Sequence, residues 1–148
     1  MDGINVFIVE DNRNDVEMIL DTLQELKMNV KAHILRDGAE AVDYFFNPAG
    51  EFITEKMQPR LVLLDLKLPK INGLEILRKL KSNERTKDIP TVVFTSSNEL
   101  RDRIESYALG ANSYLVKPLD ADMFSDYIKQ IVNYWAIMNR NAPQTGNI

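Results

Sequence analysis

Short apolar runs of the length of a β-strand alternate along this chain with segments of helical periodicity. In the helical segments, apolar residues recur at every third or fourth position, as they do on the buried face of an amphipathic helix. Parallel strands that are covered on both faces form nearly continuous apolar runs, and helices usually connect them. The alternation therefore predicts an α/β fold, a doubly wound five-stranded parallel sheet with helices on both faces. The expected strands are 4–9, 29–35, 61–65, 89–97 and 112–118.

Breaking residues and helical spacing set the limits of the other elements. Helices are expected over about 13–26, 38–46, from about 74 onward, 99–109 and 121–138. Residues 47–60 contain two prolines and a glycine, which predicts a long connecting loop. We expect residues 1–140 to form one domain and residues 141–148, which have nothing to bury, to form a disordered tail.

Composition limits the classes of protein to which the chain can belong. The 148 residues are 45% hydrophobic and 27% charged, as in ordinary globular proteins, and no apolar run approaches the length of a membrane span. The formal net charge of −4 disfavours direct DNA binding, and the absence of cysteine excludes disulfides and thiolate metal sites. No secretory signal precedes the first strand, so we expect a cytoplasmic protein without a DNA-binding domain.

Polar residues stand where four of the predicted strands end. Glu10 and Asp11 end the first strand, Asp65 the third, Thr95 the fourth and Lys117 the fifth. Each has an ordinary explanation when taken alone, such as a helix cap for Asp11 or a turn for Asp65. Because ligands of an open parallel sheet bind beyond the carboxyl ends of its strands, we expect these side chains to meet at one edge.

The chemistry that fits such a cluster is the transfer of a phosphoryl group to a carboxylate. Three neighbouring carboxylates repel one another, and hard oxygen ligands of this kind suit Mg²⁺. A bound dication would offset the repulsion among Glu10, Asp11 and Asp65 and would then neutralise the oxygens of an incoming phosphoryl group. Asp65 is the candidate nucleophile, because an ionised carboxylate needs no general base.

Four motifs carry a resemblance to a known family. They are VED at 9–11, LLDLKLP at 63–69 with Gly73 after it, FTSS at 94–97 and YLVKP at 114–118. In this order and spacing, the chain over about 4–138 resembles the CheY-like receiver domain of bacterial response regulators. The resemblance implies the flavodoxin-like strand order 2-1-3-4-5, an order that is known from a chemotaxis receiver.

The resemblance assigns roles at the predicted metal and phosphorylation site. It implies that Asp65 is the phosphoacceptor and that Glu10 and Asp11 hold Mg²⁺, or Mn²⁺, beside it. The backbone carbonyl of Lys67 would be a further metal ligand, and the Lys117 ammonium would pair with the phosphoryl group.

The resemblance also implies a switch and a set of partners. Thr95 would hydrogen-bond the phosphoryl group, and Tyr114 would reorient when Thr95 is drawn inward. The donor would be a sensor histidine kinase of a two-component system. The LDLKLPKINGLEIL stretch at 64–77, the 47–60 insertion and the long last helix further resemble stand-alone receivers paired with phytochrome-type kinases, which implies a kinase of that type. The protein would signal by protein binding rather than act as a conventional enzyme, and we expect a homodimer through the fourth helix, fifth strand and fifth helix.

Two other classes of protein remain as alternatives. A Mg²⁺-dependent phosphatase of the haloacid dehalogenase type also uses an aspartate nucleophile, but it needs an aspartate where this chain has Lys67. A flavodoxin-like binding protein shares the predicted fold, but Glu10 and Asp11 would repel the phosphate of a flavin.

Overall fold

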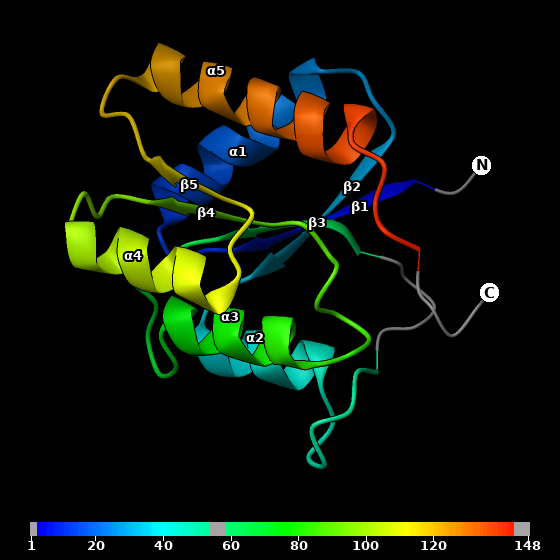
Figure 1. The fold of residues 1–148 in the computed structure, drawn as a ribbon. Helices are drawn as coiled ribbons and strands as arrows, with labels where there is room; N and C mark the ends of the chain where they lie inside the picture. The colour runs from blue at the N-terminus through cyan, green and yellow to red at the C-terminus, as the bar shows by residue number, and fades with distance from the viewer. Residues whose placement is uncertain (1–2, 54–58, 144–148) are drawn as a thin grey trace.

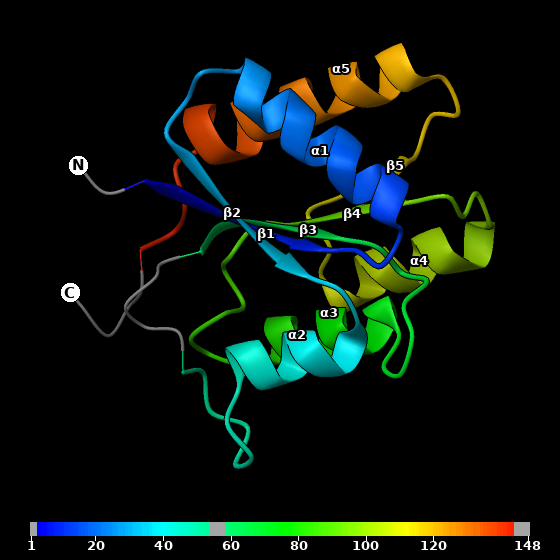
Figure 2. The ribbon, with the colours of Figure 1, turned by 180° about the vertical axis from the view of Figure 1, so that it is seen from behind.

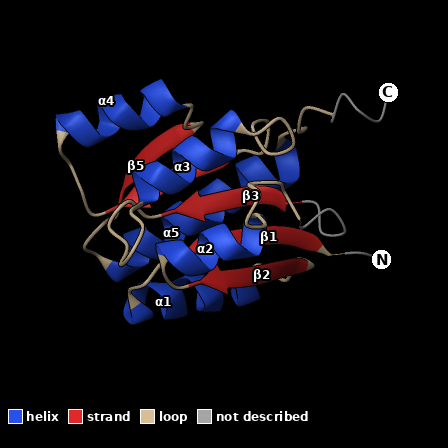
Figure 3. Cartoon of the chain, turned by 90° about the horizontal axis from the view of Figure 1, so that it is seen from below, coloured by secondary structure: helices blue, strands red, loops and turns tan. Residues whose placement is uncertain are grey.

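One parallel sheet organises the chain, with helices on both of its faces (Figures 1 and 2). The computed structural model describes residues 3–53 and 59–143. The strand order is β2-β1-β3-β4-β5, which confirms the predicted order 2-1-3-4-5. Figure 3 shows β3, β1 and β2 side by side beneath α2 and α3. The elements are β1 (Ile4–Val9), α1 (Arg13–Glu25), β2 (Val30–Leu35), α2 (Gly38–Phe45), β3 (Pro59–Leu64), α3 (Gly73–Ser82), β4 (Thr91–Thr95), α4 (Leu100–Leu109), β5 (Ser113–Val116), α5 (Ala121–Ile131) and a π-helical stretch η1 (Val132–Met138).

Each face of the sheet has its own hydrophobic core. Side chains of a strand point alternately to the two faces, so β1 contributes Phe7 and Val9 to the core beneath α2 and α3, and Val6 and Ile8 to the core beneath α1 and α5. This double coverage explains the nearly continuous apolar runs of the strands. None of the helices among the described residues combines the length and the apolar character needed to cross a lipid bilayer.

The structure corrects several of the predicted boundaries. The expected loop at 47–60 is wrong at its end, because Pro59 and Arg60 begin β3, where a first-position proline costs no ladder hydrogen bond. The same segment contains an antiparallel bridge between Phe46 and Phe52, whereas 54–58 lies outside the described residues. Strands β4 and β5 are shorter than the expected 89–97 and 112–118, and Pro90 and Pro118, which have no backbone N–H to donate to a ladder, lie just outside them.

The last helix spans the predicted residues but is not α-helical throughout. The helix predicted over 121–138 changes from α to π winding after Ile131. In the segment expected to be a disordered tail, the Asn141 side chain donates a hydrogen bond to the Arg60 carbonyl at 3.2 Å. Residues 144–148 lie outside the part of the chain that the structure describes.

Side-chain caps fix the loops that connect strands to helices. Asn12, Asp37, Asn72 and Asp120 each accept a hydrogen bond from the backbone N–H three residues later, at the starts of α1, α2, α3 and α5. All of these helix starts follow the carboxyl ends of strands, so the caps stiffen the sheet edge at which the polar residues were predicted to meet.

Two glycines allow the loop after β3 to lie unusually close to its neighbours. A Cβ atom on Gly73 would lie 2.2 Å from the Asp65 carbonyl oxygen, and one on Gly38 would lie 1.8 Å from the Ile71 carbonyl oxygen. The Gly73 N–H donates to the Leu66 carbonyl at 2.9 Å, and the Gly38 N–H donates to the Pro69 carbonyl at 3.2 Å. The starts of α2 and α3 therefore hold the loop from both sides.

A lysine at the end of α3 joins three segments at the opposite edge of the sheet. The Lys81 ammonium donates to the carbonyls of Lys87 and Ile89, at 3.0 and 2.8 Å, and to the Asn112 amide oxygen at 2.9 Å. Asn112 accepts a second bond from the Thr91 N–H, so Lys81 links α3 to the starts of β4 and β5. An ammonium has three N–H donors, and here all three are used.

Replacing Lys81 with methionine should lower the free energy of unfolding by about 1–3 kcal/mol, because a side chain of similar length is kept while three acceptors lose their donor. Chemical denaturation at neutral pH measures the change. The matched control is Lys79→Met, which removes an exposed ammonium from the same helix. Equal stability of the two variants would contradict a structural role for Lys81.

Candidate functional site

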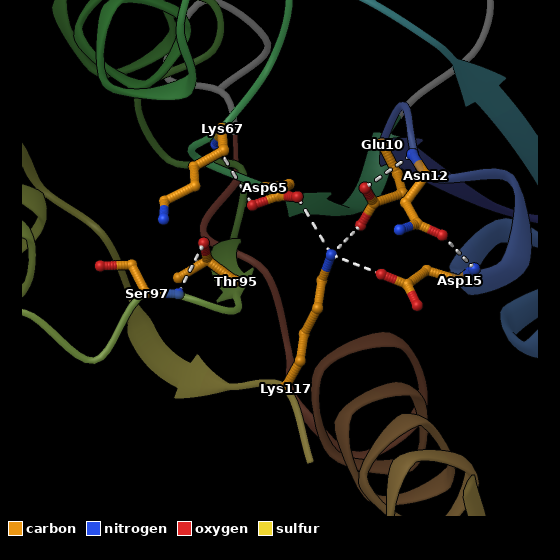
Figure 4. A network of polar contacts seen from close by, with 8 residues as sticks. All are labelled: Glu10, Asn12, Asp15, Asp65, Lys67, Thr95, Ser97 and Lys117. Atoms are coloured by element: carbon orange, nitrogen blue, oxygen red, sulfur yellow. Dashed lines mark hydrogen bonds and ion pairs between the residues drawn. The ribbon is translucent and has the colours of Figure 1, made fainter. Parts of the chain in front are cut away.

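The structure brings the predicted polar residues together at the carboxyl edge of the sheet. Asp65 follows β3 directly, and Glu10 with Asp11 follows β1. Thr95 ends β4, and Lys117 follows β5. Figure 4 shows Glu10, Asp65, Thr95 and Lys117 converging on one small volume from these separate strands. The prediction that strand ends far apart in sequence would meet is confirmed.

The Lys117 ammonium lies at the centre of the site. It forms ion pairs with the Glu10 carboxylate, with Asp15 at 2.8 Å and with Asp65 at 3.0 Å (Figure 4). Its side chain is only 8% exposed, and the side chains of Glu10 and Asp65 are 3% and 6% exposed. Buried carboxylates that lie side by side repel each other strongly. The positive charge of Lys117 offsets this repulsion.

Burial shifts the protonation equilibria of this cluster. Removal from water, followed by repulsion from Asp65, raises the pKa of Glu10 from its ordinary value of 4.5 to about 7, although Lys117 acts in the opposite direction. Burial works against the charge on Lys117, but attraction to Glu10 and Asp65 outweighs it and raises the pKa of the ammonium above its usual range. Lys117 therefore stays cationic at neutral pH.

Three carboxylates are placed to hold a metal ion together. Glu10, Asp11 and Asp65 each offer an oxygen, and these oxygens all lie within 4.8 Å of one another. Glu10 and Asp65 are buried, whereas Asp11 is exposed, so one side of the group is open to water. Hard oxygen donors of this kind suit Mg²⁺ and Mn²⁺ better than they suit softer metals. The residues present thus fit the predicted divalent ion.

Thr95 and Tyr114 are linked through the loop that follows β4. The fully buried Thr95 hydroxyl accepts the Ser97 N–H at 3.4 Å, and the Tyr114 hydroxyl donates to the Ser97 carbonyl at 3.0 Å. The Ser97 hydroxyl itself donates to Asp102 in the first turn of α4, at 2.5 Å. A displacement of Thr95 would therefore reach both β5 and α4 through Ser97.

Lys67 lies beside Asp65 on the loop that the two glycines hold. Its N–H donates to an Asp65 carboxylate oxygen at 3.3 Å. Its side chain is exposed, and Figure 4 shows it passing Asp65 toward Thr95 and Ser97. The Ser97 hydroxyl points away from Asp65, because it donates to Asp102.

Asp15 is a member of the site that was not predicted. In the sequence, Asp15 lies in the first turn of a predicted helix, where the helix dipole alone favours an acidic residue. The signal that could have identified it is its register. With Asn12 as the cap, Asp15 is the third helical residue, and side chains of a helix lean back toward its start, here toward Glu10.

Comparisons with known proteins identify relatives of this chain. A family model described as the response regulator receiver domain matches residues 6–129. The probable methanogenesis regulatory protein FilR2 of Methanothrix harundinacea is 36% identical over 140 residues, which cover 95% of this chain and 88% of FilR2. The response regulator Rcp1 of Synechocystis sp. is 35% identical over 130 residues, which cover 88% of this chain and 87% of Rcp1.

Solved structures are similar over nearly the whole chain. The phosphorylated cyanobacterial phytochrome response regulator RcpA matches with a TM-score of 0.86 and 31% identity, covering 96% of this chain and 100% of RcpA. The Mn²⁺-bound form of Rcp1 matches with a TM-score of 0.83 and 31% identity, covering 94% of this chain and 99% of Rcp1.

The raised pKa of Glu10 predicts how the stability of the metal-free protein depends on pH. Because its pKa is about 7 in the folded state and near 4.5 when the chain is unfolded, the folded state binds more protons between these values. The free energy of unfolding should therefore fall as pH rises from about 5 to about 7, by on the order of 2 kcal/mol. Denaturation in the presence of a chelator measures the fall.

Glu10→Gln should flatten this dependence, whereas Glu17→Gln, which alters an exposed side chain of α1, should leave it unchanged. Parallel pH profiles for the wild type and Glu10→Gln would contradict the assignment to Glu10.

Proposed function

The chain belongs to the response regulator receiver domain family, and we propose that it carries the signal of a two-component system as a phosphoryl group on Asp65. The observation that supports this most directly is the setting of Asp65. It is a buried carboxylate at the end of β3, within reach of Glu10 and Asp11, and ion-paired with Lys117. This is an anionic nucleophile beside a cation and a set of metal ligands, which is what transfer of a phosphoryl group to a carboxylate requires.

The transfer is a displacement at phosphorus. An Asp65 carboxylate oxygen forms a bond to the phosphorus of a phosphohistidine on the kinase while the P–N bond breaks, and the electron pair leaves with the imidazole nitrogen. Lys117 pairs with one oxygen of the transferred group, and the Thr95 hydroxyl donates to another. Glu10, Asp11 and Asp65 would hold a Mg²⁺ or Mn²⁺ ion, together with the Lys67 carbonyl, and the ion would neutralise charge on the phosphoryl oxygens.

Phosphorylation would be read out through Thr95. As the hydroxyl turns to the phosphoryl group, it leaves the Ser97 N–H, and the loop that follows β4 is freed to shift. Tyr114 and α4 share that loop, so a change at Asp65 alters the surface that they form. The signal is a shift between two populations of one fold rather than a new reaction.

The kinase that we propose as donor is of the phytochrome type. RcpA is a phytochrome response regulator, and both RcpA and Rcp1 match this chain over more than nine-tenths of its length. Their similarity supports a sensor histidine kinase of that class as the partner.

The proposed output is a homodimer through α4, β5 and α5. Several large apolar side chains are exposed on and beside these elements. A single exposed apolar residue is normal on a protein surface, whereas a group of them marks an interaction surface. They are Leu100, Ile104, Tyr107, Leu119 and Met123. Residues of this kind would be buried by a second copy of the chain.

Asp65→Asn should abolish phosphorylation. When the protein is incubated with acetyl phosphate and Mg²⁺, we expect the wild type to gain the mass of one phosphoryl group and the variant to gain none. Intact-mass spectrometry reads the result, and Asp43→Asn, which changes an exposed aspartate of α2, should behave as the wild type. An Asp65→Asn protein that still acquires an acid-labile phosphate would overturn the proposed function.

Ile104→Asp should weaken the dimer by at least about tenfold in Kd, because a charge would have to be buried in the interface. Light scattering with and without Mg²⁺ and beryllofluoride, which mimics the phosphoryl group, measures the dimer. Ile53→Asp is the control, since Ile53 is exposed to a similar degree but lies outside these elements. A wild type that stays monomeric in both states at high concentration would contradict the proposed dimer.

A further inference from the structure

We propose that Asp15 is a positioning residue that holds the Lys117 ammonium on the α1 side of the site while Asp65 is phosphorylated. The inference rests on the proposed function and adds to it a carboxylate that is not among the candidate metal ligands. Asp15 acts through Lys117 and does not touch the transferred group.

Each N–H donor of the Lys117 ammonium is matched by one carboxylate. An ammonium has three N–H donors, and among the described residues Lys117 pairs with three carboxylates, those of Glu10, Asp15 and Asp65. The resting site therefore leaves Lys117 no donor for a phosphoryl oxygen. At least one of the three pairs has to be given up when the phosphoryl group arrives.

The three partners differ in what else they do. Glu10 and Asp65 belong to the group that can hold a metal ion, and Asp65 also forms the bond to phosphorus. Asp15 lies outside that group, and its distance of 2.8 Å to Lys117 is no longer than that of Asp65, at 3.0 Å. When Glu10 and Asp65 turn to the metal ion and the phosphoryl group, Asp15 is the partner that Lys117 keeps.

The position of Asp15 is well fixed. Its N–H donates to the side chain of the cap residue Asn12 at 3.0 Å, and the Asn12 N–H donates in turn to Glu10 at 3.1 Å. The Asp15 side chain is 16% exposed, so it reaches the edge of the buried cluster while its backbone belongs to the first turn of α1. The helix dipole favours a carboxylate at this place, independently of Lys117. Asp15 is thus a rigid anchor for a long and otherwise flexible lysine.

Loss of the anchor has a definite consequence. Without Asp15, the ammonium would be drawn entirely to Glu10 and Asp65, and it would then compete with the metal ion for the same oxygens. It would also have to leave these oxygens before it could pair with the phosphoryl group. Metal binding and phosphoryl transfer should both suffer, the second more strongly because small misplacements of a reacting group are costly.

Three variants separate this role from a general effect of charge. Asp15→Ala removes the anchor, Asp15→Asn keeps an oxygen that can accept the Lys117 hydrogen bond, and Glu17→Ala removes a charge from an exposed position of the same helix. Calorimetric titration of the unphosphorylated protein with Mg²⁺ gives the metal Kd. The rate of phosphoryl transfer is followed with acetyl phosphate at saturating Mg²⁺.

Relative to Glu17→Ala, we expect Asp15→Ala to raise the Mg²⁺ Kd several-fold and to slow transfer by about tenfold, and Asp15→Asn to recover most of both losses. Asp15→Ala values within twofold of Glu17→Ala would overturn the inference, as would an Asp15→Asn protein no better than Asp15→Ala. If the wild type itself takes no phosphoryl group on Asp65, the proposed function fails, whereas a phosphorylated wild type with an indifferent Asp15→Ala removes this inference alone.

A measurement on the wild type avoids any effect of the substitutions on folding. In a crystal structure with Mg²⁺ and beryllofluoride bound, the Lys117 nitrogen should remain within hydrogen-bond distance of an Asp15 oxygen and also contact a fluorine. A Lys117 that has left Asp15 for the beryllofluoride would refute the proposal.

Discussion

One buried ammonium makes the functional edge of this protein possible. Glu10 and Asp65 lie together out of water, where two carboxylates alone would repel each other strongly and would resist ionisation. Lys117 pairs with both and with Asp15, and its own burial is tolerated only because these three anions surround it. The parallel sheet brings three of these four charges together, because Glu10, Asp65 and Lys117 follow strands that end at one edge, and the first turn of α1 adds Asp15.

The fold was largely predictable, because apolar runs and helical spacing are local signals. The strand order, the two covered faces and the family resemblance are confirmed. Errors arose where a local signal was ambiguous. Pro59 was assigned to a loop because proline breaks strand interiors, although it is tolerated at a first position. The change of winding after Ile131 leaves no mark in the spacing of apolar residues.

The site was predictable to the extent that it follows from strand ends. Glu10, Asp65, Thr95 and Lys117 each end or follow a strand, so the topology alone brings them together. Asp15 lies on a helix. Its register was a usable signal, but its contact with Lys117 also depends on how α1 is placed relative to the end of β5, which is not apparent in a single sequence. The direction of the Ser97 hydroxyl toward Asp102 was hidden for the same reason.

The two loops that flank Asp65 and Thr95 differ in the freedom of their sequences to change over evolution. On one side, Gly38 and Gly73 admit no side chain at all, because a single added carbon would meet a backbone carbonyl. On the other side, hydrogen bonds of side chains at Ser97, Asp102 and Tyr114 hold the loop, and such groups can be exchanged for others of different strength. Substitutions in the loop after β4 can therefore change how firmly that loop is held, whereas the loop after β3 has to keep the geometry around Asp65, the proposed phosphoacceptor.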